Sequence, residues 1–170
     1  MTLTKNKYYF EALDNYPYSL TQCLEALNYA LSYDPEDADS LCLMGRIYSE
    51  ILKDYETAKI YFEGAMQSNV SNVNTPKYYI SCLLDNEDYE EAEKLIEFAL
   101  NIKGIDKADI LYCKAFLFEK KEDYKMALEQ IRQAKRFSYC KNMVDFLNDR
   151  EIFVKNKMPK RQNKKKEETR

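Results

Sequence analysis

The chain has 170 residues, of which 45% are hydrophobic, enough to bury one core and too apolar for disorder throughout. Histidine is absent and the five cysteines lack any Cys-x-x-Cys spacing, which argues against both a zinc site and a disulfide framework. The net charge is −3, and no apolar run is long enough for a signal peptide or a membrane span. With only three glycines and four prolines, this composition predicts a helical protein of the cytoplasm.

Four pairs of amphipathic helices are predicted in chain order, because apolar residues recur at three- and four-residue spacing. The first helices of the pairs fall near residues 4–14, 39–52, 76–85 and 107–120, and the second helices near 18–33, 55–68, 89–102 and 124–137. Asp34-Pro35 and the segment 72–74 separate successive pairs, and Thr75-Pro76 gives the third pair an N-cap followed by proline.

The pairs repeat one another in sequence. Asp54-Tyr55, Asp88-Tyr89 and Asp123-Tyr124 recur at intervals of 34 and 35 residues. Two small residues follow each Asp-Tyr pair at constant spacing. The same spacing extended back by one period reaches two more small residues in the first pair of helices. These are Cys23 and Ala30, Ala58 and Ala65, Ala92 and Ala99, and Ala127 and Ala134. A period of this length indicates stacked helix hairpins, and small residues let the helices approach closely.

These residues resemble the tetratricopeptide repeat family, whose pattern combines a small residue, a tyrosine, the Asp-Tyr pair and two alanines. The second unit matches it best and carries one extra residue in its internal turn; its matching residues are Leu41, Gly45, Tyr48, Tyr55, Ala58, Phe62 and Ala65. The third unit departs from the pattern at Pro76 and Ile80. The resemblance covers roughly residues 4–138. It implies an all-α, right-handed superhelical solenoid of about four hairpins, with the first helices on the concave side.

A further amphipathic stretch from Met143 to Val154 is predicted to form a capping helix, because the last repeat has no neighbour to cover its outer face. The expected organisation is a tetratricopeptide-like domain over residues 1–154 and a basic, disordered tail over residues 155–170. The tail holds eight Lys or Arg against Glu167 and Glu168, and the rest of the chain carries a net charge of −9.

Catalysis is not expected from this sequence. Gly-rich phosphate loops and a Gly-x-Ser-x-Gly turn are missing, and histidine is absent. The adjacent carboxylates Glu90-Glu91 point in different directions on a helix and are typical of solvated surface. The sequence therefore predicts no enzyme, no cofactor and no metal.

A partner-binding stripe is predicted on the concave side, formed by first-helix residues that the core does not use. Its members are Asp39, Cys42, Arg46, Ser49, Lys77, Ser81, Leu84, Asp109, Tyr112, Phe116 and Glu119. Tyr112 and Phe116 are expected as apolar anchors, since large exposed apolar groups mark interfaces. Arg46 and Lys77 are expected to orient an acidic group. The alternative is that the capping helix folds back and covers the two aromatic residues.

The predicted function is a scaffold or adaptor that holds a protein or peptide segment in this groove. Two alternatives stay open: a tetratricopeptide-type secretion or assembly chaperone, and a regulator that contacts RNA or membrane through its tail. Residues 155–170 themselves allow three interpretations. We favour a solvated end, ahead of contact with nucleic acid or anionic membrane, and of docking on the acidic body of another copy.

Overall fold

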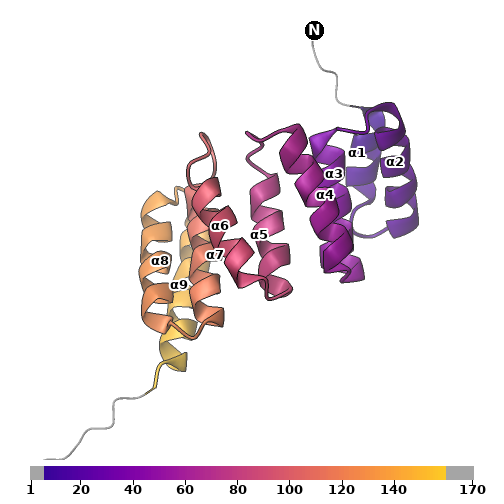
Figure 1. Ribbon diagram of the computed structural model, residues 1–170. Coiled ribbons are helices and arrows are strands. Elements are labelled where there is room, and N and C mark those ends of the chain that lie inside the picture. Colours follow the sequence, from indigo (N-terminus) through magenta and orange to yellow (C-terminus); the bar gives the residue numbers. More distant parts are fainter. Residues whose placement is uncertain (1–5, 160–170) are drawn as a thin grey trace, which may run out of the picture.

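The computed structural model describes residues 6–159, and all regular structure in that range is helical. The helices pair in chain order, α1 with α2 through α7 with α8, and α9 follows (Figure 1). Their bounds are α1 Lys7–Asn15, α2 Leu20–Tyr33, α3 Ala38–Arg46, α4 Tyr55–Ser68, α5 Thr75–Asp85, α6 Tyr89–Ala99, α7 Lys107–Lys120, α8 Tyr124–Phe137 and α9 Lys141–Lys157, with a π-helical segment, η1, at Ile47–Leu52. The predicted pairs and the capping helix are therefore present.

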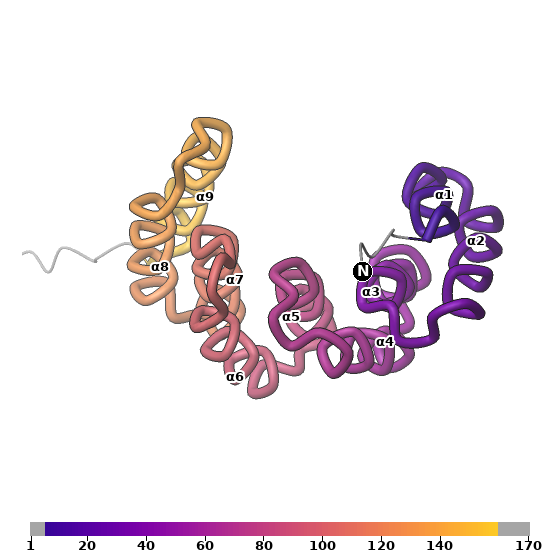
Figure 2. The backbone as a smooth tube through the Cα atoms, turned by 90° about the horizontal axis from the view of Figure 1, so that it is seen from above, coloured from indigo at the N-terminus to yellow at the C-terminus, as the bar shows by residue number. Residues whose placement is uncertain are grey.

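The four hairpins stack side by side into an open arc (Figure 2). The first helices, α1, α3, α5 and α7, line the inner side of the arc, and α2, α4, α6 and α8 form its outer side. Each hairpin packs on the next, because one hairpin alone cannot bury its apolar faces. The predicted helical solenoid is thus confirmed.

The recurring small residues lie where helices pack most closely. None of them is more than 1% exposed; they are Cys23, Ala30, Ala58, Ala65, Ala92, Ala99, Ala127 and Ala134. The second hairpin shows how tight the packing is, since a Cβ added to Gly45 would meet the buried ring of Phe62 at 2.8 Å. A larger side chain at such a crossing would push the two helices apart.

The turns inside the second, third and fourth hairpins share one backbone geometry. The residue before each Asp-Tyr pair has a positive φ: Lys53 at 57°, Glu87 at 63° and Glu122 at 60°. In the third and fourth hairpins, the Asp N–H donates to a carbonyl five residues back, Asp88 to Leu83 and Asp123 to Phe118. The left-handed residue lets the chain reverse while the last carbonyls of the first helix stay bonded.

The second hairpin accommodates its extra residue by widening the end of its first helix. The Asp54 N–H donates to the carbonyl of Tyr48, six residues back, at 2.9 Å. The turn before it, η1, is π-helical. The insertion inferred from the sequence is therefore absorbed in the helix, and the Asp-Tyr pair keeps its place in the repeat.

The last helix, α9, packs along α8 and closes the C-terminal end of the stack (Figures 1 and 2). Leu147 and Val154 are fully buried in the core that α7 and α8 form. The helix continues to Lys157. Its end therefore lies beyond the boundary between domain and tail that the sequence analysis placed between residues 154 and 155. The remainder of the predicted basic tail, from residue 160, falls outside the described residues.

Replacing Gly45 by alanine is expected to lower the free energy of unfolding by about 1–3 kcal/mol, because the new methyl group collides with the Phe62 ring. Gly64 supplies the control. An added Cβ there meets only Leu41, at 3.6 Å, so Gly64→Ala is expected to stabilise helix α4 by about 0.5–1 kcal/mol. Urea unfolding followed by circular dichroism measures both. A neutral Gly45→Ala variant would contradict the tight crossing.

Replacing Glu122 by glycine is expected to raise the free energy of unfolding by about 0.5–1 kcal/mol. Glycine relieves the left-handed strain of about 1–2 kcal/mol, less the entropy that it adds to the unfolded chain. Glu122→Ala removes the same exposed carboxylate and keeps the strain, so it is the matched control. Equal thermal midpoints for the two variants would show that the strain is absent.

Candidate partner-binding groove

Three adjoining pockets follow the inner helices of the arc. The first, of about 250 Å³, lies among α1, α3 and α5 and includes Tyr9, Leu13 and Arg46. The second, of about 200 Å³, lies between the starts of α5 and α7 and shares Asn74 and Tyr78 with the first. The third, of about 790 Å³, lies where α7 begins and α8 meets α9, and it shares four lining residues with the second. The shared residues place the three pockets next to one another, and we call them together the inner groove.

Arg46 occupies the first pocket and is held on three sides. Its guanidinium carbon lies 4.6 Å from the ring centroid of Tyr16 and 4.1 Å from that of Tyr78. Its Nε donates to Oε1 of Glu50 at 3.0 Å, and the Tyr16 hydroxyl donates to the other oxygen of Glu50. Burial and the Glu50 charge raise the pKa of Tyr16 to about 12, so the hydroxyl remains a donor. This clamp joins the first three hairpins.

Lys77 occupies the second pocket and is also paired. Its Nζ lies 2.5 Å from Oδ2 of Asp109, across the gap between α5 and α7. Burial alone would lower the pKa of Lys77, but the hydrogen bond and charge of Asp109 reverse the direction and raise it. Both cations expected to receive an acidic partner group are therefore already engaged with carboxylates of the chain itself.

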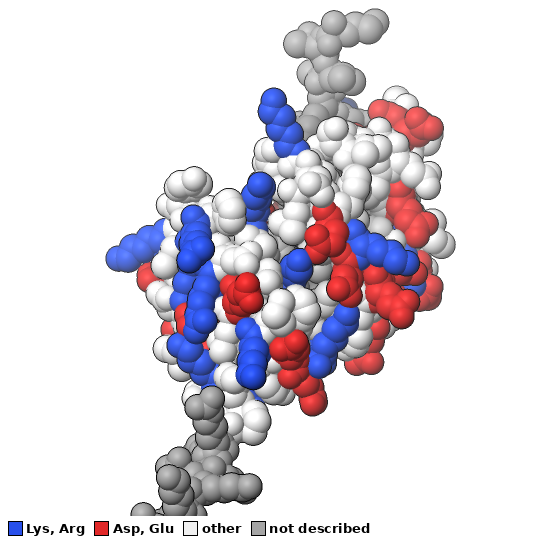
Figure 3. Space-filling view, turned by 60° about the vertical axis from the view of Figure 1, so that its left-hand side comes forward, with Lys and Arg blue, Asp and Glu red and all other residues white. Residues whose placement is uncertain are grey.

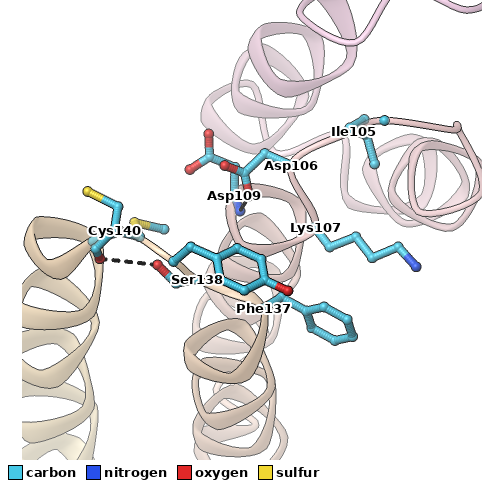
Figure 4. Close-up of a pocket in the computed structure, with 10 residues that line it drawn as sticks. Ile105, Asp106, Lys107, Asp109, Phe137, Ser138 and Cys140 are labelled. Atoms are coloured by element: carbon cyan, nitrogen blue, oxygen red, sulfur yellow. Dashed lines mark hydrogen bonds between the residues drawn. The ribbon is translucent and has the colours of Figure 1, made fainter.

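The third pocket combines apolar walls with charges at the start of α7 (Figure 4). Asp106 caps α7 by accepting from the backbone N–H groups of Ala108 and Asp109. Lys107 extends on the side of Phe137, and its Nζ lies 5.5 Å from the ring centroid. Phe137 is 45% exposed, which leaves an aromatic surface available at this end of the groove.

Helix α9 covers the end of the predicted stripe. The ring of Phe146 contacts Tyr112 edge to face, with centroids 5.0 Å apart. Glu119 is 8% exposed and accepts from Lys157 at 2.6 Å and from Arg150. Phe116 is partly buried against the central core. The capping helix thus folds back over Tyr112, one of the two aromatic residues that the alternative interpretation placed beneath it, and also over Glu119.

The stripe residues differ in burial and in whether they line the inner groove, and Cys42 is both buried and part of the lining. Cys42, Ser49, Leu84 and Glu119 are buried, so the expectation that the core does not use them was wrong. They are covered because the inner helices pack against neighbours on both sides. Asp39, Cys42, Arg46, Lys77 and Asp109 line the inner groove, whereas Ser49, Ser81, Leu84, Tyr112, Phe116 and Glu119 line none of its pockets. Their roles in binding stay predictions.

Several groove residues escaped the sequence analysis because they lie in α1, in the connections between elements or near the ends of other helices. These are Tyr9, Leu13, Val73, Asn74, Tyr78, Gly104, Ile105, Asp106, Lys107, Phe137, Tyr139 and Met143. The sequence does hold a signal for some of them. Phe137 and Tyr139 are aromatic residues at and just after the end of a second helix, where the repeat pattern does not require an aromatic residue. Tyr139 is fully exposed.

The buried thiols are poorly suited to nucleophilic chemistry. Burial raises the pKa of Cys42 to about 11, and that of Cys82 and of Cys113 to about 12, so all three stay protonated at neutral pH. Within residues 6–159, no group of three or more Cys, Asp or Glu side chains is placed to hold a metal ion. In the same range, no helix combines the length and apolarity needed to cross a bilayer.

No family model matches the sequence, and no curated protein matches it significantly. Solved structures do. PilF from Pseudomonas aeruginosa has a TM-score of 0.73 and 18% identity over 88% of this chain and 70% of its own. The thermophilic TPR protein TTC0263 from Thermus thermophilus has a TM-score of 0.73 and 16% identity over 88% and 80%. MamA from Desulfovibrio magneticus RS-1 has a TM-score of 0.65 and 17% identity over 88% and 86%. The chain therefore has the fold of the tetratricopeptide repeat proteins.

Glu151 anchors α9 through ion pairs and gives this docking a pH dependence. Its carboxylate contacts Lys135 at 2.6 Å, Lys155 at 2.7 Å and Arg132 at 3.4 Å. Hydrogen bonds from Lys135 and Lys155 lower the pKa of Glu151 from 4.5 to about 2. The stabilisation is therefore present above about pH 4.5 and is lost as the pH falls through about 2.

Glu151→Gln is expected to lower the thermal midpoint at neutral pH, with the difference from the wild type shrinking as the pH falls from 4.5 towards 2. Differential scanning calorimetry across this range measures the effect. Glu129→Gln, at an exposed position on α8 without an ion pair to any described residue, is the control. A constant difference between wild type and Glu151→Gln at all pH values would contradict the assignment.

Proposed function

We propose that this protein is a protein-binding scaffold that holds an extended segment of a partner in the inner groove. The succession of three neighbouring pockets along α1, α3, α5, α7 and the start of α9 is the observation that supports this function. Such a groove offers successive subsites for the side chains of one extended chain. The cytoplasmic location expected from the sequence belongs to the same proposal.

The partner segment is mainly apolar in this proposal. The groove's aromatic and aliphatic surface includes Leu13 at one end, Tyr78 in the middle and Phe137 at the other end. An acidic segment would have to displace Glu50 from Arg46 or Asp109 from Lys77. The two cations therefore shape the groove through their pairs, and the anchoring role expected of Tyr112 and Phe116 passes to the groove aromatics.

A displayed library of random peptides, selected on the immobilised protein, supplies the probe for this function. Peptides that bind are expected to be rich in apolar residues, with affinities then measured by fluorescence anisotropy. Leu13→Ala and Phe137→Ala lie at opposite ends of the groove, and each is expected to weaken the same peptide about tenfold or more.

Phe98→Ala provides the matched control, because Phe98 is 43% exposed against 45% for Phe137 and lines none of the groove pockets. A peptide whose affinity falls in only one of the two groove variants would show that the pockets bind separately. Peptides that respond to neither end, or a selection that yields none, would overturn the groove as the binding site.

A further inference from the structure

The outer surface of the first hairpin carries a second groove, distinct from the inner one. It lies between α1 and α2, measures about 380 Å³, and its lining includes Tyr8, Glu11, Glu25 and Tyr29. The neighbouring hairpin packs on other residues of α1 and α2, such as Ala12 and Leu27, and of the groove lining only Ala26 belongs to that shared core. We call this surface the end groove.

The end groove is aromatic. The ring of Tyr8 stacks on Tyr29 at 5.4 Å and on Tyr33 at 5.8 Å. Tyr29 is 60% exposed and Tyr33 is 72% exposed, so the outer faces of this stack meet solvent. Exposed tyrosine faces attract cations through the charge distribution of the ring. Lys7 already shows this contact, with its Nζ 4.7 Å from the centroid of Tyr8.

The end groove is also acidic. Glu11 and Glu25 line it, and both are exposed without an ion pair to any described Lys or Arg. Helix α2 ends beside the stack at Tyr33 with no basic residue in its last turn, so the negative end of its dipole is uncompensated. Residues 6–52 as a whole hold two Lys or Arg and eight Asp or Glu, a net charge of −6.

The opposite end of the chain has the complementary charge. Residues 105–159 hold twelve Lys or Arg against nine Asp or Glu. In Figure 3, Lys and Arg side chains predominate in the left part of the face shown, and Asp and Glu side chains in its right part. Residues 160–170 add six Lys or Arg against two Glu, a net charge of +4. Eleven residues can extend roughly 36 Å, long enough to lie across a groove of two helices.

We propose that the end groove binds the basic C-terminal segment, residues 160–170, of a second copy of this chain. Helix α9 ends at the far end of the arc from α1 and α2 (Figures 1 and 2), so the contact joins separate copies head to tail. Lys and Arg side chains lie on the tyrosine faces and pair with Glu11 and Glu25. A head-to-tail contact leaves an unoccupied groove at one end of each assembly and an unbound segment at the other, so unless a ring closes it builds chains of copies whose length grows with concentration.

The first test is self-association of the full chain in sedimentation velocity. At an ionic strength of about 0.01 M, where charges act over about 30 Å, the sedimentation coefficient is expected to rise steadily with protein concentration. It returns to the monomer value near 1 M salt and in a chain truncated after Pro159. A monomer at every concentration at low ionic strength would overturn the proposal.

The second test places the contact on the end groove. A fluorescent synthetic peptide with the sequence of residues 160–170 is titrated with the protein at low ionic strength. Glu11→Gln with Glu25→Gln is expected to weaken binding about tenfold, whereas Glu90→Gln with Glu91→Gln, an equal charge change on α6, leaves it unchanged. Tyr29→Leu also weakens binding, and Tyr18→Leu, at a 93% exposed tyrosine outside the groove, does not.

Equal loss of peptide binding in the two glutamate double variants would show diffuse attraction to an acidic body and would reject the end groove. Unchanged binding in Tyr29→Leu would remove the tyrosine stack from the contact and defeat the proposal in this form. None of these variants touches the inner groove. Failure here therefore leaves the proposed scaffold function standing, and failure of the peptide selection leaves this contact standing.

Discussion

Two helices can cross at short distance only where no bulky side chain stands between them, and this packing constraint organises the whole chain. Cysteine, alanine or glycine fills the closest positions, and Phe62 lies where Gly45 leaves room for its ring. Because the crossings recur at nearly constant spacing, successive hairpins repeat the same geometry and the stack bends into an arc. The inner groove follows from this arrangement, because neighbouring first helices contact each other along their sides and leave space between them on the inner side of the arc.

The widened turn of the second hairpin connects an irregularity of the sequence to the groove. Each added residue rotates a helix by about 100°, so an insertion changes which side chains face inward at the end of α3. Here Ser49 is buried, while Glu50 contacts Arg46 and Tyr16. A π-helical turn is marginal in isolation, and the Glu50 contacts give this one a partner in the first hairpin. The widened turn therefore contains Glu50, the carboxylate of the clamp around Arg46.

The fold was predictable from the sequence because its signals are local and repeated. The Asp-Tyr pair and the alanines that follow it locate each turn and each crossing, and α7 and α8 were placed to the residue. The groove was predictable only in part. A helix face identifies Arg46 and Lys77, and the four-residue spacing of Arg46 and Glu50 is itself local. The partner of Lys77 comes from another helix, since Asp109 lies 32 positions further along the sequence. The residue pattern of a single helix does not encode a pairing between helices. A cation that looks available for a partner in the sequence can therefore form an ion pair within the chain.

The same reasoning explains why the buried members of the stripe were misjudged. On an isolated hairpin, Leu84 and Glu119 would face solvent, since they do not point at the second helix. In the stack, Leu84 enters the central core and Glu119 receives two cations from α9. A residue's exposure in a solenoid therefore depends on the next helices of the chain as much as on its own helix.

The two ends of the stack differ in whether a further helix of the chain covers the terminal hairpin. At the C-terminal end, α9 supplies apolar residues and the cations that bind Glu119, so the last hairpin is covered from within the chain. At the other end, among the described residues, the first hairpin leaves Tyr29 and Tyr33 open beside unpaired carboxylates. An open aromatic face at a solenoid end is the surface on which one more unit would stack. Its charge selects a basic occupant, and the most basic segment of this sequence lies at its own C-terminus.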